Sequence, residues 1–172
     1  MAVRKLVPHP TDLAAFLVPL PRGYFAVIST VDAAEVGRFN WSAITKDGDG
    51  VPRYAHRRRV VDGKLTHQTL HGLISELMGM PGGTTPDHRD LNGLDCRRSN
   101  LRPSDRAQSA QNRGIRRDSG TGIKGVWRHG NRWIGAVMAN GKRYRQGFDS
   151  IEEATTFVVA TRRALHGEFA RN

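Results

Sequence analysis

Apolar and polar positions in the first 80 residues alternate over short distances, which predicts several small elements rather than one long one. The turn Asp62-Gly63 is a strong hairpin signal between two of them. A helix is expected where apolar side chains recur every three or four residues, at Leu70, Leu73, Ile74, Leu77 and Met78. The predicted elements are a β-rich run at 24–28, a short helix at 32–39, strands at 54–61 and 64–66, and a helix at 69–78. The pattern therefore predicts a small α/β segment over residues 1–84.

The last 50 residues have a different and clearer pattern. Three strands are expected at 123–128, 132–138 and 142–148, and Asn140-Gly141 marks a tight hairpin between the last two. Ser150, with Glu153 three residues later, marks the start of a helix. Strand alternation places one set of side chains toward that helix: Val126, Trp133, Val137, Tyr144 and Phe148. Residues 122–172 should form a three-stranded antiparallel sheet packed on one helix.

The segment 85–113 lies between these parts and is rich in polar side chains. Asp87-His88 fits a short strand, Asn92-Gly93 favours a turn with positive φ, and residues 100–102 fit a returning strand. Ser104 is a plausible N-cap for a polar helix over 105–112. The order is strand, loop, strand, helix, and a basic linker follows at 114–121. The whole chain is thus predicted to be α+β.

The net charge of the chain adds to this picture, because it indicates a class of binding partner. The net charge is +11 and the pI is near 11.0, with positive excess in all three parts of the chain. A polyanion is the first hypothesis for such a balance, and a merely basic protein is the alternative. No apolar run approaches the length of a membrane span and no secretory leader is present, so we expect an intracellular, cytoplasmic protein without a membrane partner.

Three residues of the central segment suit phosphodiester hydrolysis. The reaction needs a base for water, a divalent cation held by hard oxygen ligands, and a group that fixes the base. A neutral imidazole at His88 suits the base, and the adjacent Asp87 offers an anionic oxygen. Asn100 stands where a returning strand would begin. The alternative is that Asp-His is a turn pair without chemistry.

The phrases Asp87-His88, Arg97-Arg98-Ser99-Asn100-Leu101-Arg102 and Gln111-Asn112-Arg113 resemble the HNH nuclease family, in the zinc-free variant of phage and intron homing endonucleases. The resemblance implies a ββα-metal unit and a site-specific, nicking DNA endonuclease. In it His88 is the base, Asp87 binds Mg²⁺ (or Mn²⁺), and Asn100 braces the loop and orients His88. That family usually has histidine or asparagine nine residues after Asn100, where this chain has Ser109; Asn112, one turn later, could compensate.

Two sets of residues are expected to contact double-stranded DNA. The first is a group of arginines around the predicted site: Arg97, Arg98, Arg102, Arg106 and Arg113. The second comes from resemblance. The phrases Gly-Ile-Lys-Gly-Val, Arg-Trp-Ile-Gly and Leu-His-Gly-Glu-Phe-Ala, within residues 122–170, are similar to the APETALA-type DNA-binding domain of plant ethylene-response factors and many phage homing endonucleases. That likeness implies a DNA-facing set of Lys124, Trp127, His129, Arg143 and Arg145.

Two further expectations limit the cofactors and partners. Cys96 is the only cysteine, which excludes an intramolecular disulfide and a structural zinc site built on paired cysteines. One nuclease motif per chain favours a monomer, and no protein partner is evident. The resemblance implies that the chain is encoded by a phage or an intron. The competing hypothesis is a DNA-binding or regulatory protein on a decayed nuclease scaffold, because Ser109 is a poorer metal ligand than an amide oxygen.

Overall fold

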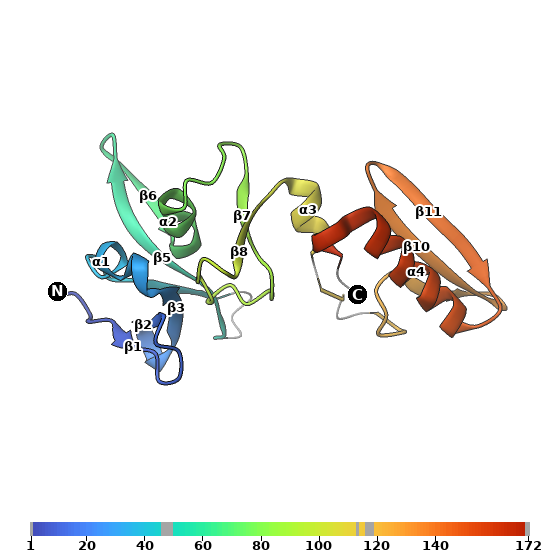
Figure 1. The fold of residues 1–172 in the computed structure, drawn as a ribbon, viewed down its shortest axis with the longest axis horizontal. Helices are drawn as coiled ribbons and strands as arrows, with labels where there is room; N and C mark the ends of the chain where they lie inside the picture. The colour runs from blue at the N-terminus through green and yellow to red at the C-terminus, as the bar shows by residue number, and fades with distance from the viewer. Residues whose placement is uncertain (1, 46–49, 113, 116–118, 171–172) are drawn as a thin grey trace. The chain divides into compact units, whose positions relative to one another are not determined.

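The structure is a computed structural model that describes residues 2–45, 50–112, 114, 115 and 119–170 (Figure 1). It divides the chain into two compact units, Met1–Ser104 and Asp105–Asn172. Both units combine strands and helices, which confirms the α+β class. The boundary between them lies inside the predicted 85–113 segment. Arg113 and residues 116–118 of the expected linker lie outside the described residues.

Three small antiparallel sheets make up the strands described in the first unit (Figure 1). Each is built from strands that are neighbours in the sequence, as expected where short turns connect them. The first sheet holds β1 (Val7–Pro8), β2 (Ala15–Pro19) and β3 (Phe25–Ser29); the second holds β4 (Ser42–Thr45), β5 (Pro52–Val61) and β6 (Lys64–Thr69); the third holds β7 (Thr85–His88) and β8 (Leu101–Ser104).

The β5–β6 hairpin forms where the sequence predicted it. Asp62 and Gly63 have φ angles of 49° and 70°, the positive values that a tight two-residue turn requires. Thr69 caps the following helix α2 (Leu70–Leu77) by accepting a hydrogen bond from the backbone N–H of Gly72. The predicted helix at 32–39 is shorter: a 3-10 turn at Thr30–Asp32 leads into α1 (Ala33–Val36).

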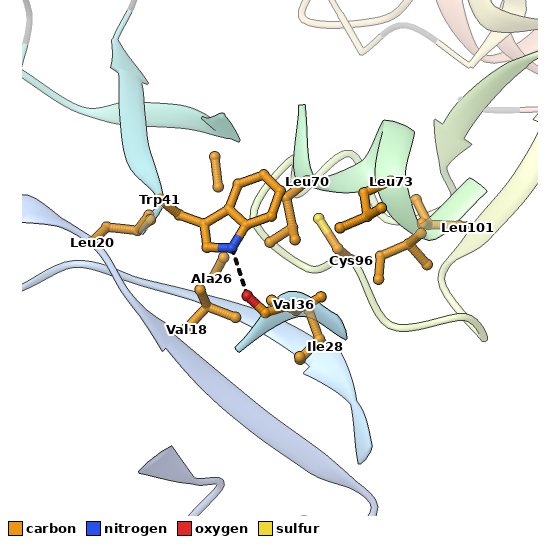
Figure 2. Close-up of a cluster of buried hydrophobic side chains, with 12 residues drawn as sticks. Val18, Leu20, Ala26, Ile28, Val36, Trp41, Leu70, Leu73, Cys96 and Leu101 are labelled. Atoms are coloured by element: carbon orange, nitrogen blue, oxygen red, sulfur yellow. Dashed lines mark hydrogen bonds between the residues drawn. The ribbon is translucent and has the colours of Figure 1, made fainter. Parts of the chain in front are cut away.

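One hydrophobic core joins these pieces of the first unit. Trp41 lies at its centre and is 1% exposed, and its indole N–H donates to the Val36 carbonyl at 3.1 Å (Figure 2). The buried face of α2 supplies Leu70, Leu73 and Ile74. Cys96 is fully buried in the same cluster (Figure 2).

The second unit has the predicted sheet packed on one helix. Its sheet order is β11 (Lys142–Phe148), β10 (Arg132–Ala139), β9 (Val126–His129), and α4 (Ile151–His166) covers one face. Ser150 caps α4 as predicted, by accepting a hydrogen bond from the Glu153 N–H. The core holds Val126, Val137, Ala154 and Val158, with Trp133, Phe148 and Phe157 packed against them.

Two details of the second unit differ from the sequence prediction. Tyr144 does lie on the α4 side as predicted, because the register pairs it with the buried Val137, and it is 38% exposed there because β11 is an edge strand. The first strand begins at Val126, because Gly125 has φ of 73° and ends the extended run. The helix α3 (Arg106–Gln111) is capped by Asp105 in a capping box with Gln108, and Ser104 belongs to β8 instead.

No helix among the described residues is both long and apolar enough to cross a membrane.

Candidate functional site

The predicted catalytic pair lies at the end of β7. This strand pairs with β8 in antiparallel register, so that Asp87 is opposite Arg102 and His88 is opposite Leu101. The loop between the strands is fixed by β3, because the Val27 N–H donates to the Leu94 carbonyl and the Cys96 N–H donates to the Val27 carbonyl, both at 2.8 Å. These two hydrogen bonds form an isolated parallel bridge between Val27 and Asp95, which ties the loop to β3.

Asn100 braces this loop from inside. Its side-chain amide donates to a carboxylate oxygen of Asp90 and to the Asp95 carbonyl, both at 2.8 Å. Its side-chain oxygen accepts a hydrogen bond from the Asp90 N–H at 3.2 Å. The Asn100 carbonyl also accepts a hydrogen bond from the Arg89 N–H, the residue after His88. One side chain therefore closes the loop at both ends, which is the bracing geometry expected from the sequence; its part in catalysis stays a prediction.

The turn inside the loop is made differently from the prediction. Asn92-Gly93 was expected to supply the positive φ, but Leu91 adopts it, with φ of 66°. Gly93 is needed for close packing instead: a Cβ atom there would lie 2.2 Å from the Arg53 carbonyl oxygen and 2.5 Å from the Tyr54 ring. The loop therefore presses its backbone directly against β5.

His88 is buried among aromatic and sulfur groups. It is 7% exposed, and its Nε2 atom lies 4.0 Å from the Cys96 sulfur. Its ring centroid is 5.1 Å from that of His71 and 6.0 Å from that of Tyr54. Burial lowers the pKa of His88, and the carboxylates of Asp90, Asp87 and Asp95 offset part of that effect. The imidazole is therefore neutral at pH 7, the form that a general base requires.

His71 lies beside His88, a contact that the sequence analysis did not find. It lies in the first turn of α2, next to the apolar stripe, and sequence periodicity carries no information on what the helix faces. Burial, followed by the charge of His88, lowers the pKa of His71 to about 4. Its Nδ1 atom is buried without a hydrogen-bond partner among the described residues.

Asp87, the predicted metal ligand, is held by a buried arginine. The Arg102 guanidinium contacts the Asp87 Oδ2 atom from both Nε and Nη2, each at 3.0 Å. The Arg102 side chain is 3% exposed and that of Asp87 is 11% exposed. This burial removes Arg102 from the set of residues expected on a DNA-binding surface. The guanidinium instead holds the Asp87 carboxylate in place beside His88.

The other two loop arginines are also engaged in ion pairs. Arg97 binds Asp95 at 2.5 Å and Asp12 at 3.0 Å, and its bond to Asp95 raises the pKa of the guanidinium. Arg98 binds the buried Asp32 at 2.6 Å. Both side chains keep about a third of their surface exposed, 36% and 35%. They anchor the loop to the first unit, a role that sequence reasoning did not assign, and contact with DNA stays a prediction for their exposed parts.

Ser109 and Asn112 lie in the second unit. The Ser109 N–H donates to the Asp105 carbonyl within α3, and Asn112 ends the helix and is 3% exposed. Asp87 and these two residues therefore belong to different compact units. Their joint action as metal ligands stays a prediction.

Four residues of the expected DNA-facing set share one face of the second sheet. The strand register places Trp127, His129, Arg143 and Arg145 on the face opposite α4. The guanidiniums of Arg143 and Arg145 lie 5.6 Å and 5.9 Å from the centroid of the Trp127 ring, above the small side chain of Ala136 on the central strand.

The fifth residue, Lys124, does not lie on that face. It precedes β9, and its Nζ atom donates to the Gln111 carbonyl at 2.6 Å, at the end of α3. This corrects its predicted place among the sheet contacts. Sequence reasoning missed Arg132 and Met138, which the register adds to the same face and which are both largely exposed. Period-two alternation along β10 was the signal that could have found them.

Comparison with known proteins finds a phage protein that is similar enough in sequence to show the family of this chain. No family model matches the chain, and no solved structure does. Protein 3.8 of Escherichia phage T7 is 33% identical over 94 residues, which is 54% of this chain and 78% of the phage protein. Identity at this level over most of that phage protein establishes common descent, and the chain belongs to the family of phage T7 protein 3.8.

Proposed function

We propose that this protein is a divalent-metal-dependent DNA endonuclease of the HNH homing type that acts in the cytoplasm of a phage host. The observation that carries the proposal is the environment of β7. A neutral, buried His88 follows the arginine-bound Asp87 at the end of a strand, and Asn100 closes the loop that leads to the paired strand β8. The helix α3 follows directly in sequence, which completes the chain order of a ββα-metal unit.

In this proposal His88 takes a proton from the water that attacks the scissile phosphate. The neutral imidazole accepts it, and the carboxylates of Asp87, Asp90 and Asp95 favour the imidazolium that results. Asn100 acts on His88 through the backbone, because it fixes the residues that follow His88. It is a positioning residue rather than a catalytic one.

Asp87 would hold a hard cation such as Mg²⁺ or Mn²⁺, because a carboxylate oxygen is a ligand that Mg²⁺ prefers and the ion retains waters. Ser109 and Asn112 belong to the second unit, and their part in binding the cation stays a prediction. A bound cation would neutralise charge on the phosphate and stabilise the leaving 3′ oxygen. Arg102 already shares the Asp87 carboxylate, so we expect the cation to bind weakly and to be needed at high concentration.

Double-stranded DNA is the proposed substrate because the second unit presents a basic and aromatic face. Trp127, Arg143 and Arg145 are clustered there, with His129 and Arg132 on the same side of the sheet. Guanidiniums suit phosphates, and a short sheet fits the major groove. In this proposal the first unit cleaves the DNA, and the sheet of the second unit recognises the target sequence.

The test is cleavage of supercoiled plasmid in a titration of Mg²⁺ or Mn²⁺, with chelator as a control. Wild type should nick the plasmid, and His88→Ala should abolish nicking while DNA affinity changes little. His67→Ala, which removes an exposed histidine elsewhere in the same unit, is the matched control and should cut normally. Cleavage by His88→Ala within a fewfold of wild type would exclude His88 as the base.

The competing function is DNA binding on a scaffold that has lost nuclease activity. Two observations favour it: Ser109 replaces the usual amide or imidazole ligand, and Arg102 is bound to Asp87. Ser109→Asn separates the two functions. If it raises nicking at low Mg²⁺, the protein is a weak nuclease. If neither protein cuts with any divalent cation but both retain sequence-selective binding in a gel-shift assay, the binding function replaces the proposed one.

A further inference from the structure

A cluster of two histidines and the single cysteine includes the proposed base His88, and its other two members, His71 and Cys96, have no role in the reaction described above. His71 comes from α2, His88 from the end of β7, and Cys96 from the β7–β8 loop. One ligand atom from each lies within 4.8 Å of the others. The Cys96 sulfur is 4.0 Å from the His88 Nε2 atom, and the two imidazole rings meet edge to face.

The chemistry of these three groups suits a borderline or soft ion and not Mg²⁺. Thiolate and imidazole are the preferred ligands of Zn²⁺, whereas Mg²⁺ requires oxygen. Two nitrogens and one sulfur around a tetrahedral zinc ion lie roughly 3.3 to 3.6 Å apart, from bond lengths of about 2.0 and 2.3 Å. The observed separations are a little wider, so that small side-chain rotations would close the ligands on an ion.

The cluster is already largely dehydrated and neutral. Cys96 is fully buried and His88 is 7% exposed, and the buried Nδ1 atom of His71 has no hydrogen-bond partner among the described residues. The lowered pKa of His71 leaves its ring uncharged at pH 7, as metal binding requires. Burial raises the pKa of Cys96, so binding must release its thiol proton to solvent, at a cost that the metal–sulfur bond has to offset.

We propose that His71, His88 and Cys96 form a binding site for Zn²⁺ or a similar thiophilic divalent ion, and that its occupation switches off the nuclease by capturing His88. The site differs from a structural zinc site on paired cysteines, because it has one cysteine and three protein ligands with a fourth position left for water. The binding half of this proposal stands on the cluster alone. The inhibitory half rests on the proposed function, because it needs His88 to be the base.

Binding is measured with Co²⁺ as a spectroscopic probe of the full-length protein. Because Cys96 is the only cysteine, any thiolate-to-metal absorption band must come from it. Wild type should give that band with one equivalent of Co²⁺, and Zn²⁺ should displace it. Zn²⁺ should also protect the thiol from a thiol-reactive reagent in partially denaturing buffer, a readout that needs no variant.

Variants then identify the ligands. Cys96→Ala should lose the band, and His71→Gln should weaken Co²⁺ affinity at least about tenfold, since even the loss of an outer-shell partner costs about 10–100-fold. His56→Ala is the matched control, because His56 and His67 stack on the β5–β6 hairpin with Nδ1 atoms 3.1 Å apart and could bind metal without sulfur. It should leave the band unchanged. Absence of the band in wild type, or a band insensitive to His71→Gln, overturns the site.

Inhibition is measured separately, as nicking at fixed Mg²⁺ with increasing Zn²⁺. Wild type should lose at least about tenfold of its rate once Zn²⁺ exceeds the protein concentration. His71→Gln, which keeps the base, should nick and resist Zn²⁺. A band that forms without any effect of Zn²⁺ on nicking would reject the inhibitory role alone. A wild type that binds Co²⁺ but never cuts DNA would reject the proposed nuclease function and leave the metal site standing.

Discussion

Gly93 is required because the loop packs closely against β5 at this residue, and not because its backbone adopts an unusual conformation. The backbone of the loop lies against β5 at this point, with no room for a side chain. Its neighbour Leu91 carries the positive φ that an L-residue adopts only at a cost of about 1–2 kcal/mol. The loop therefore tolerates local strain in order to keep its backbone pressed onto the strand and His88 in its buried position.

The first prediction concerns this contact. Gly93→Ala places a Cβ atom 2.2 Å from the Arg53 carbonyl oxygen, so either the loop or β5 must shift. We expect a loss of about 2–4 kcal/mol in the free energy of unfolding, in the range of overpacking and strain. Chemical denaturation of Gly82→Ala is the control, because a Cβ atom at Gly82 meets nothing within 4 Å. Equal stability of the two variants would contradict the close approach.

The second prediction concerns pH. The folded state holds the pKa of His71 at about 4, below its unfolded value of 6.5, so the unfolded chain binds protons more readily between these values. Stability is therefore complete above pH 6.5 and falls as the pH drops toward 4, by about 3 kcal/mol from this one group. Denaturation with chelator present should show that slope in wild type. His71→Gln should reduce it, and an unchanged slope would assign the effect to other groups.

At the scale of elements, the strands and turns were predicted well because their signals are local. Asp62-Gly63 and Asn140-Gly141 specify their hairpins through the φ angles that each pair accepts, and all four residues adopt positive values. The Ser150 cap was predictable for the same reason. Short helices were predicted less well, since α1 is a single turn continued from a 3-10 turn, and tertiary packing decides its length.

The sequence predicted the residues of the candidate site that lie close together along the chain, but not their partners from distant segments. Asp87, His88 and Asn100 are close in sequence and their arrangement follows from strand pairing. The partners from elsewhere could not be found this way. His71 meets His88, Arg98 meets Asp32 and Arg97 meets Asp12, and each contact depends on how separate sheets pack together. The period of apolar positions and the spacing of residues along the sequence carry no information about how separate elements pack together.

The third prediction tests the sheet face of the second unit. Arg145 and Lys142 are exposed basic residues on β11, but register places them on opposite faces. Arg145→Ala should weaken DNA binding and reduce the slope of log affinity against log salt concentration by about 0.9, the value for one phosphate contact. Lys142→Ala, on the α4 side, is the control and should change neither. Equal effects of both substitutions would mean that DNA is held by net charge and not by this face.

At the scale of the whole molecule, the chain has two separate hydrophobic cores. Trp41 and α2 anchor one, and the packing of α4 on β10 forms the other. Gly135 restricts the second core, though less severely than Gly93 restricts the first, because a Cβ atom there would lie 3.0 Å from Phe157 and Val158. Two cores of this kind should unfold as two cooperative units.

The fourth prediction is that each unit can be destabilised by itself. Calorimetry of the intact protein should show two transitions. Gly93→Ala should lower the midpoint of one and Gly135→Ala that of the other, each by roughly 4–8 °C for every 1 kcal/mol of stability lost in a unit of this size. If either substitution shifts both transitions equally, the two cores fold as one.

The loop that carries the proposed chemistry is tied to the beginning of the chain. Arg97 binds Asp12, 85 residues away in sequence, and an isolated parallel bridge ties the loop to β3. Contacts of such long range form late, after the local hairpins, because closing the intervening chain costs entropy. During synthesis the strands β1 to β3 leave the ribosome first, and the β7–β8 loop that contacts them follows later. In the proposed function, the base His88 and its loop therefore reach their working arrangement only after residues 1–104 have emerged and folded, and shorter unfinished chains lack that arrangement.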